Sequence, residues 1–407
     1  MKESKIKTLV LYSYINETLA YLFDWQDAFE QHPALDSTLL DINQIAESQK
    51  TIKANIQDYE LIVLLHSTNG FSLGTLKKYK KLLNQRTGKL VIFIGEELNY
   101  AQKGIRMQDK INFMKEINPD FIATMLLVDT ARKIYEDVTS ATVLGIPHAL
   151  NPKRFYPTTP NNERSIDIGT TSHRYWPFLG DQERNNIMEF FSSLNRDDLK
   201  IQIKASQGVQ GRYSVDSWPK FLNSCKGTVA TEAGGYYLEK DDRTVTNITK
   251  HFQKQQGIVK RNIMPLIEKY KNKIPVPISV KIQKLVKKMT GKRVSYNDTY
   301  YDLDFNEIYE LFFKNYQNPL NGKTISSRHF DAIGTKTCQI MFDGRFNDIL
   351  VSGKHYIALK RDFSNIKQVL EQFKDDEYRN NLVDETYEFV RDNHTHVHRI
   401  EELLSHI

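Results

Sequence analysis

The chain has 407 residues, of which 40% are hydrophobic and 26% charged, a composition typical of a soluble globular protein with about two domains. The longest apolar run, near Leu61–Leu65, is far shorter than the roughly 20 residues that span a bilayer, and the polar stretch Tyr12–Glu17 argues against a signal peptide. Two cysteines exclude a disulfide framework, argue against a structural zinc site and favour a reducing cytoplasm. The net charge of +6 suits an anionic ligand or membrane surface and does not by itself indicate a nucleic-acid binder.

Short apolar runs alternate with amphipathic stretches over residues 1–150. The predicted strands are Ile6–Tyr12, Leu39–Ile42, Glu60–His66, Lys89–Gly95, Phe121–Leu127 and Ala141–Ile146, with helices at Glu17–Gln31 and Leu73–Asn84. Continuous apolar strands separated by helices predict a parallel sheet covered on both faces, which is a doubly wound α/β domain. The ligand crevice of such a sheet lies beyond the carboxyl ends of its strands.

Three loops are therefore expected at this crevice: Tyr12–Glu17, His66–Gly70 and Gly95–Tyr100. No G-x-G-x-x-G fingerprint follows the first strand, and the chain has no Walker A lysine motif. Both motifs supply backbone amides to phosphates at that turn, so their absence argues against a dinucleotide oxidoreductase and against an NTPase.

The stretch Gly145–Pro157 reads as a linker, because its three prolines cannot continue either neighbouring element. A second alternation follows, with strands at Ser165–Gly169, Leu199–Ala205, Gly227–Thr231, Thr337–Phe342 and His355–Ala358, and helices at Gln182–Leu194, Val215–Ser224, Asn365–Phe373, Glu377–Arg391 and Val397–Ser405. The sequence thus predicts two α/β domains, residues 1–150 and 151–407. Ligands favour the cleft between such domains.

Residues 236–325 interrupt the second alternation and read as a polar, basic insertion. Residues 260–293 contain eleven Lys or Arg and a single acidic residue, Glu268, and apolar residues are interleaved with them. Short helices of this kind suit an anionic membrane surface or an acidic polymer, and equally suit packing on the second domain or plain solvation. We hypothesise peripheral membrane contact through residues 255–293.

Residues 325–404 carry the pattern of a known family. The pattern comprises Arg328, Phe330, Asp331-Ala332, Gly334, the strand Cys338–Phe342, Gly353–Ile357 and Asp362-Phe363. Together with the ending HTHVHRIEELL and the linker GIPHALNPKRFYP, it resembles the nucleotide-binding segment of bacterial glycosyltransferases of the spore-maturation-protein type, within the GT-B group-1 glycosyltransferases. The resemblance implies two facing Rossmann-like domains, with a nucleotide-sugar held mainly by the second, an acceptor held mainly by the first, and no further cofactor.

The chain departs from one signature of that group, a Glu followed after seven residues by a second Glu. The second carboxylate corresponds to Asp331, which is shorter by one methylene and puts the expected ribose contact in question. We place the first at Glu232, in TEAGG, with the insertion between the two positions. Glu232 is therefore a candidate catalytic residue.

Glycosyl transfer leaves negative charge on a nucleoside diphosphate, which helix N-termini and basic side chains can neutralise without a metal. The candidate nucleotide-sugar-binding residues are Thr171, Arg174, Gly234, Gly235, Arg328, Asp331, Gly334 and Lys336, with Lys204 as a weaker candidate. For each Arg or Lys the alternative is a solvated surface charge. For the two glycines it is a plain turn, and for Asp331 a carboxylate that favours a helix dipole.

An inverting transfer also needs a base at the acceptor hydroxyl, whereas a retaining one does not. His66 is our candidate, and Glu17, Glu96 and His148 occupy similar predicted loops. The alternating histidines at 394, 396 and 398 are poorly spaced for a metal site, and Thr395 is instead expected to be the N-cap of the last helix.

The sequence therefore predicts a cytoplasmic, metal-independent glycosyltransferase that acts on a glycan or surface glycoconjugate. Two alternatives remain open: a GT-B-shaped nucleotide-sugar epimerase, and a non-catalytic module that binds nucleotide or polymer. The expected partners are a nucleotide-sugar donor, a glycan acceptor and an anionic membrane surface, and nucleic acid is not among them.

Overall fold

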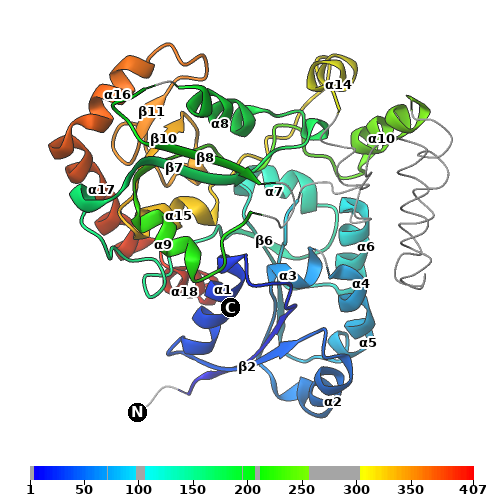
Figure 1. The fold of residues 1–407 in the computed structure, drawn as a ribbon. Coiled ribbons are helices and arrows are strands. Elements are labelled where there is room, and N and C mark those ends of the chain that lie inside the picture. Colours follow the sequence, from blue (N-terminus) through cyan, green and yellow to red (C-terminus); the bar gives the residue numbers. More distant parts are fainter. Residues whose placement is uncertain (1–3, 71, 98–105, 195, 207–210, 256–302) are drawn as a thin grey trace, which may run out of the picture.

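A computed structural model describes residues 4–70, 72–97, 106–194, 196–206, 211–255 and 303–407 of the chain. It contains two parallel sheets, each covered by helices on both faces (Figure 1). The predicted fold class is confirmed. Among the residues described, no helix is long and apolar enough to cross a membrane. The predicted basic helices between residues 260 and 293 lie outside the described ranges, so the hypothesis of membrane contact is not tested.

The first sheet has the strand order β2-β1-β3-β4-β5-β6. Its strands are β1 (Ile6–Tyr12), β2 (Leu35–Asp41), β3 (Leu61–Leu64), β4 (Lys89–Phe93), β5 (Phe121–Thr124) and β6 (Thr142–Gly145). Its helices are α1 (Ala20–Gln31), α2 (Ile45–Asn55), α3 (His66–Asn69), α4 (Leu73–Leu76), α5 (Lys80–Leu83), α6 (Met107–Ile117) and α7 (Val128–Tyr135). All four side chains of β3 are buried, as expected for a central strand covered on both faces.

The second sheet has the order β11-β10-β9-β7-β8. Its strands are β7 (Ile166–His173), β8 (Ile201–Ser206), β9 (Cys225–Ala230), β10 (Cys338–Phe342) and β11 (Ile357–Leu359). The helices are α8 (Glu183–Ser193), α9 (Ser217–Asn223), α10 (Arg243–Gln255), α14 (Phe305–Phe312), α15 (Ser327–Gly334), α16 (Ile366–Lys374), α17 (Asp376–Asn393) and α18 (His396–Leu404).

The end of the chain returns to the first sheet. In α18, Ile400 and Leu403 pack in the same buried cluster as Trp25 and Phe29 of α1 (Figure 1). The predicted N-cap of this helix, Thr395, is confirmed and forms a capping box. The last helix therefore supplies part of the cover that the first sheet needs on this face.

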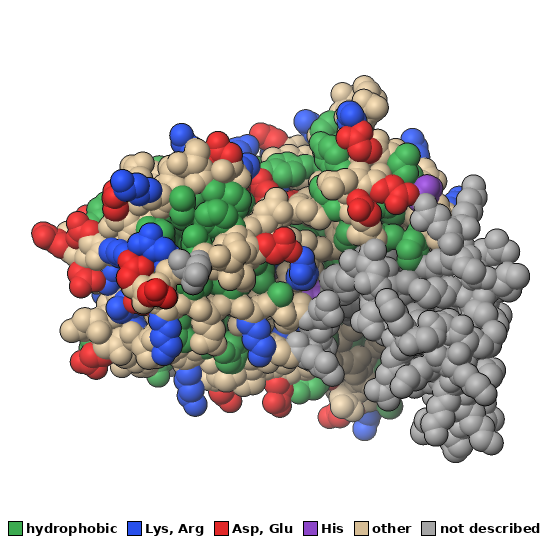
Figure 2. Space-filling view, turned by 45° about the horizontal axis from the view of Figure 1, so that its top comes forward, with side chains coloured by type: hydrophobic (Ala, Val, Ile, Leu, Met, Phe, Trp, Pro, Cys, Tyr) green, Lys and Arg blue, Asp and Glu red, His purple; other side chains and the backbone are tan. Residues whose placement is uncertain are grey.

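The inserted region also reaches the first domain. Leu238, which precedes α10, packs in the core cluster of the first sheet. Lys240 forms an ion pair of 3.6 Å with Asp137, which follows α7. The two sheets are thus joined by the linker, by α18 and by the first residues of the insertion. On the face drawn in Figure 2, basic and acidic side chains are interspersed over the described surface.

Candidate active site

Each sheet has a point where the strand order reverses, between β1 and β3 and between β7 and β9. Ligands of open parallel sheets bind outside the carboxyl ends of the strands at such a point. In the second domain, the chain leaves β7 through His173 and leaves β9 through Thr231 and Glu232. These segments and the start of α15 build the candidate site.

Three arginines gather at the carboxyl end of β7, and we call them the arginine cluster: Arg184 in the first turn of α8, Arg212 after β8, and Arg328 in the first turn of α15. Burial, with the positive charges of Arg184 and Arg212, lowers the pKa of Arg328 to about 10. Burial and these same three arginines lower the pKa of His173 to about 4. The three arginines therefore act on one another and on His173, which is neutral near pH 7.

The arginine cluster is not neutralised by nearby acids. No carboxylate of the described residues forms an ion pair with any of the three guanidinium groups, although Asp331 acts on Arg328 from a longer distance. Arg328 donates a hydrogen bond to Ser172, and the Arg184 guanidinium lies 4.0 Å from the centre of the Tyr175 ring. The Nε atom of Arg212 is buried without a hydrogen-bond partner among the described residues. Such an arrangement favours an anionic ligand.

The start of α15 adds backbone donors beside Arg328. Ser326 is the N-cap and forms a capping box with His329, which satisfies the N–H group of His329. The first turn of a helix leaves further N–H groups without intrahelical partners, and the helix dipole favours negative charge there. This end of the helix is consequently suited to phosphate oxygens.

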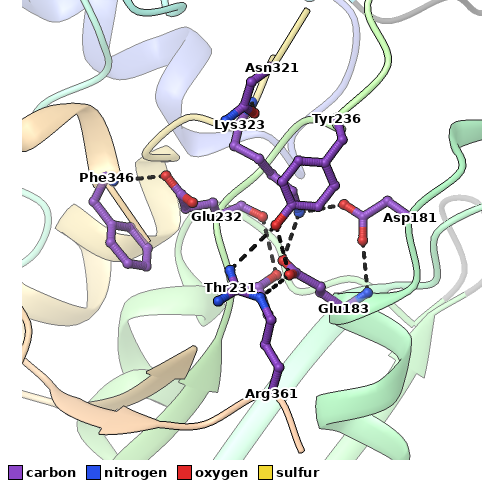
Figure 3. Close-up of polar contacts among 9 residues, drawn as sticks. All are labelled: Asp181, Glu183, Thr231, Glu232, Tyr236, Asn321, Lys323, Phe346 and Arg361. Carbon is purple, nitrogen blue, oxygen red and sulfur yellow. Dashed lines mark hydrogen bonds and ion pairs between the residues drawn. The ribbon is translucent and has the colours of Figure 1, made fainter. Parts of the chain in front are cut away.

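A buried network of charges lies next to this site (Figure 3). Lys323, whose side chain is 1% exposed, forms ion pairs with Asp181 and, at 2.9 Å, with Glu183. Glu183 also accepts hydrogen bonds from Arg361 and, at 2.8 Å, from the Tyr236 hydroxyl. Burial alone would raise the pKa of Glu183, but Lys323 and its other partners outweigh burial and lower it. Glu183 begins α8, so this network holds the helix turn that carries Arg184.

Glu232 is buried beside the network and faces the turn after β10 (Figure 3). One carboxylate oxygen accepts a hydrogen bond of 2.8 Å from the backbone N–H of Phe346. The other lies only 2.4 Å from the place that a Cβ atom would take at Gly344, so only glycine fits there. Burial raises the pKa of Glu232, and the hydrogen bond from Phe346 opposes that rise.

Several other predicted residues lie along the same edge of the second sheet. Thr171 is buried in β7, and its hydroxyl has no partner among the described residues. Gly234, at φ +82°, packs against the backbone of Gly322, and the carbonyl of Gly235 accepts a hydrogen bond from Gly322. Asp331, 4% exposed, accepts a hydrogen bond of 2.9 Å from the Trp218 indole.

Four predicted residues lie apart from the arginine cluster. Arg174 forms an ion pair with Glu189 of α8. Lys336 forms an ion pair of 2.7 Å with Asp384 of α17, and Lys204 is exposed on the edge strand β8. A Cβ atom at Gly334 would lie 2.5 Å from Leu150 in the linker, so this glycine permits close packing of α15 on the linker. None of these contacts brings the four residues into the arginine cluster.

His66 lies in a buried aromatic group of the first domain. Its ring centre is 5.2 Å from that of His148 and 5.4 Å from that of Trp25, whose indole donates a hydrogen bond to His148. His396 of α18 packs edge-on against Trp25. Burial lowers the pKa of His66 well below its usual value, and His148 and His396 contribute. Within the described ranges, no set of His, Cys, Asp or Glu side chains could hold a metal ion.

Sequence analysis did not identify Arg184, Arg212 or the buried Lys323 as site residues. One signal was available for Lys323. It stands eight residues before Asp331, and the group-1 signature has its first Glu at the position that Lys323 occupies. A lysine at that position is buried only because Asp181 and Glu183 neutralise it. Both partners lie far away in the sequence, in the loop before α8 and at its start.

Comparisons with solved structures agree with the fold. HepE from Anabaena, solved with UDP-glucose, matches 99% of this chain and 100% of its own at 9% identity and a TM-score of 0.52. An alpha-glucosyltransferase solved with UDP and a 13-mer DNA matches 99% of both chains at 9% identity and a TM-score of 0.54. The fold is GT-B. Two Rossmann-like domains of this GT-B chain therefore face each other, as expected.

Sequence comparison reaches a smaller part of the GT-B chain. Residues 283–405 match a family model described as glycosyl transferase-like. This range contains α14 to α18, including Arg328, Asp331 and the turn after β10. No curated protein matches the chain in sequence.

Proposed function

We propose that this GT-B protein is a group-1 glycosyltransferase of the spore-maturation-protein type, which transfers a sugar from a nucleotide-diphosphate sugar to a glycan or surface glycoconjugate. The observation that carries the proposal is the arginine cluster. It gathers three guanidinium groups without a carboxylate partner among the described residues, at the ligand-binding edge of a GT-B donor domain. The glycosyl transferase-like match to residues 283–405 supports the same reaction class.

In the proposed reaction, a bond forms between the acceptor oxygen and the anomeric carbon while the bond from that carbon to the diphosphate breaks. The electron pair of the broken bond leaves with the diphosphate, whose negative charge grows in the transition state, and the departing diphosphate takes up the proton that the acceptor hydroxyl loses. Arg184, Arg212, Arg328 and the start of α15 offer guanidinium and backbone donors to that charge. Because Arg184, Arg212 and Arg328 are half-buried, these interactions are stronger than they would be in bulk solvent. The proposal requires no metal ion.

A thermal-shift panel of UDP, GDP, CDP, ADP and dTDP, without metal and then with magnesium, tests the donor site. Structures of HepE and of the alpha-glucosyltransferase contain UDP or UDP-glucose, so UDP is the first ligand to test. We expect one nucleotide to raise the melting temperature without metal. Arg184→Gln and Arg212→Gln should reduce that shift. Arg196→Gln, which removes an exposed arginine paired with Asp198, should preserve it.

Turnover then separates the three functions. A transferase forms a glycosylated acceptor from the matching nucleotide-sugar, an epimerase converts the nucleotide-sugar without an acceptor, and a non-catalytic module binds the nucleotide without converting it. No shift with any nucleotide would contradict the proposal.

A further inference from the structure

The turn after β10 has an unusual backbone. Phe346, Asn347 and Asp348 all have positive φ angles, of 44°, 55° and 60°. Left-handed conformations are unfavourable for residues other than glycine, and three in succession persist only where the surroundings hold them. Something in the structure must therefore stabilise residues 344–348.

Glu232 is the group that holds this turn from inside the second domain. Its carboxylate accepts the Phe346 N–H at 2.8 Å, and its second oxygen packs against Gly344, so the carboxylate spans the start and the middle of the turn. Phe346 is 0% exposed, so its N–H would have no water to bond if Glu232 were removed.

Asn347 connects the same turn to both sides of the cleft. Its side-chain oxygen accepts a hydrogen bond of 2.7 Å from the N–H of Ile325, which directly precedes Ser326, the N-cap of α15. Its side-chain amide donates a hydrogen bond of 2.8 Å to the carbonyl of Met125, which follows β5 in the first domain. The turn therefore lies between the start of the helix that carries Arg328 and the first domain.

We infer that Glu232 is a positioning residue: it holds the turn 344–348, and through Asn347 it sets the start of α15, with Arg328, against the first domain. The inference rests on the proposed function only in assigning the donor diphosphate to Arg328. Glu232 contributes a hydrogen-bond acceptor on a side chain long enough to reach the N–H of Phe346. A glutamine can supply the same acceptor without the charge, whereas alanine cannot.

Amide hydrogen exchange of Glu232→Gln, Glu232→Ala and Asn347→Gly tests the structural part without any substrate. We expect Glu232→Ala to speed exchange in peptides covering 343–349 and 325–330, and Glu232→Gln to resemble the unmodified protein. Asn347→Gly tolerates the left-handed backbone but loses both side-chain hydrogen bonds, so it should speed exchange mainly at 325–330. Glu310→Ala, which removes an exposed carboxylate paired with Lys314, serves as the control and should change neither peptide.

Kinetics of the same variants test the role in the reaction. We expect Glu232→Ala to raise the donor KM by roughly 10-fold, the effect of leaving one buried donor unpaired, with a smaller change in kcat. Glu232→Gln, which keeps the acceptor, should change the donor KM and kcat much less than Glu232→Ala does. If Glu232→Gln lost kcat as fully as Glu232→Ala while exchange stayed normal, the negative charge would act on the reaction itself and the inference would be wrong. Normal exchange in Glu232→Ala would also overturn it.

Failure of the proposed function gives a different result. An unmodified protein that turns over no nucleotide-sugar and binds no nucleotide contradicts the glycosyltransferase proposal. The exchange measurements would still decide whether Glu232 holds the turn and the start of α15.

Discussion

Asp242 caps a helix of the other domain: its carboxylate accepts a hydrogen bond of 3.1 Å from the backbone N–H of Met107, the first residue of α6. The second oxygen accepts the N–H of Gln108 at 3.2 Å. Asp242 is 2% exposed and directly precedes α10. A residue at the beginning of the insertion thus stabilises the first turn of a first-domain helix.

Replacing Asp242 by alanine should lower the free energy of unfolding by about 1–2 kcal/mol, the usual value of a lost N-cap. Asp242 also has a φ of 55°, which alanine adopts less readily than asparagine, so Asp242→Asn should cost less than Asp242→Ala. Urea unfolding measures both. The neighbouring Asp241, exposed and paired with Arg243, provides the matched control, and Asp241→Ala should change stability by less than about 0.5 kcal/mol. If Asp242→Ala and Asp241→Ala lowered the free energy of unfolding equally, Asp242 would not act as the N-terminal cap of α6.

Lys323→Met should destabilise the protein by about 3–5 kcal/mol, because it leaves the buried carboxylate of Asp181 without a cation and Glu183 with Arg361 alone. The exposed Lys314 pairs with Glu310, and Lys314→Met should cost less than about 1 kcal/mol. Chemical unfolding of the two variants under identical conditions compares them. A small loss for Lys323→Met would mean that water or a rearranged Arg361 takes over the role of the lysine.

Arg212→Gln should weaken binding of the nucleotide identified in the thermal-shift panel by about 10-fold, since it removes one charge-assisted contact to the diphosphate. The same change should leave the melting temperature of the free protein unchanged or slightly higher. It removes a positive charge that repels Arg328 and His173 and breaks no ion pair among the described residues. Titration calorimetry and thermal unfolding measure the two effects. A large loss of stability without ligand would instead make Arg212 a structural residue.

The buried histidines predict a loss of stability in acid. Burial lowers the pKa of His148 to about 3 and, together with His148, lowers that of His396 to about 3. An unfolded histidine has a pKa near 6.5, so the unfolded chain binds more protons below that pH. Stability should therefore fall as the pH drops from about 6.5 towards about 3, by up to about 1.4 kcal/mol per pH unit for each histidine.

His396→Phe tests this prediction, because phenylalanine can keep the edge-on contact with Trp25 and cannot be protonated. We expect unfolding free energies within about 1 kcal/mol of the unmodified protein at pH 8. At pH 5 the variant should have gained about 2 kcal/mol relative to the unmodified protein. His406→Phe changes an exposed histidine near the C-terminus. It should leave the dependence of the unfolding free energy on pH unchanged. If the unfolding free energies of His396→Phe and of the unmodified protein depended on pH in the same way, His396 would not cause the loss of stability in acid.

Replacement by alanine should change the stability of the protein in opposite directions at two glycines. Gly334→Ala places a Cβ atom 2.5 Å from Leu150 and 2.7 Å from the carbonyl of Phe155, so it should cost about 1–3 kcal/mol of stability. Gly74 lies in α4 with nothing within 4 Å of a new Cβ atom, and Gly74→Ala should stabilise the protein by up to about 1 kcal/mol. Thermal unfolding checks both. Loss of nucleotide affinity in Gly334→Ala without loss of stability would restore this glycine to the binding site.

The sequence by itself determined the fold, because its signals are local. The predicted strand Ile6–Tyr12 has the same bounds as β1, and the other predicted strands overlap β2 to β11. The helices without predicted bounds are α2, α3, α6, α7, α10, α14 and α15, and α3 lies within the predicted loop His66–Gly70. Apolar runs, proline breaks and the N-cap at Thr395 each depend on neighbouring residues, so the chain order alone shows them. The GT-B arrangement then followed from the resemblance of residues 325–404 and the linker.

Only the tertiary structure decided which charges are neutralised and which are left for a ligand. Arg174 and Arg184 look alike in the sequence, yet Arg174 has a carboxylate partner and Arg184 has none among the described residues. Lys323 meets Glu183 across 140 positions, and Glu232 meets Phe346 across 114. The pKa and the role of a charged side chain depend on burial and on partners that folding brings together from distant positions. No pattern of neighbouring residues contains that information.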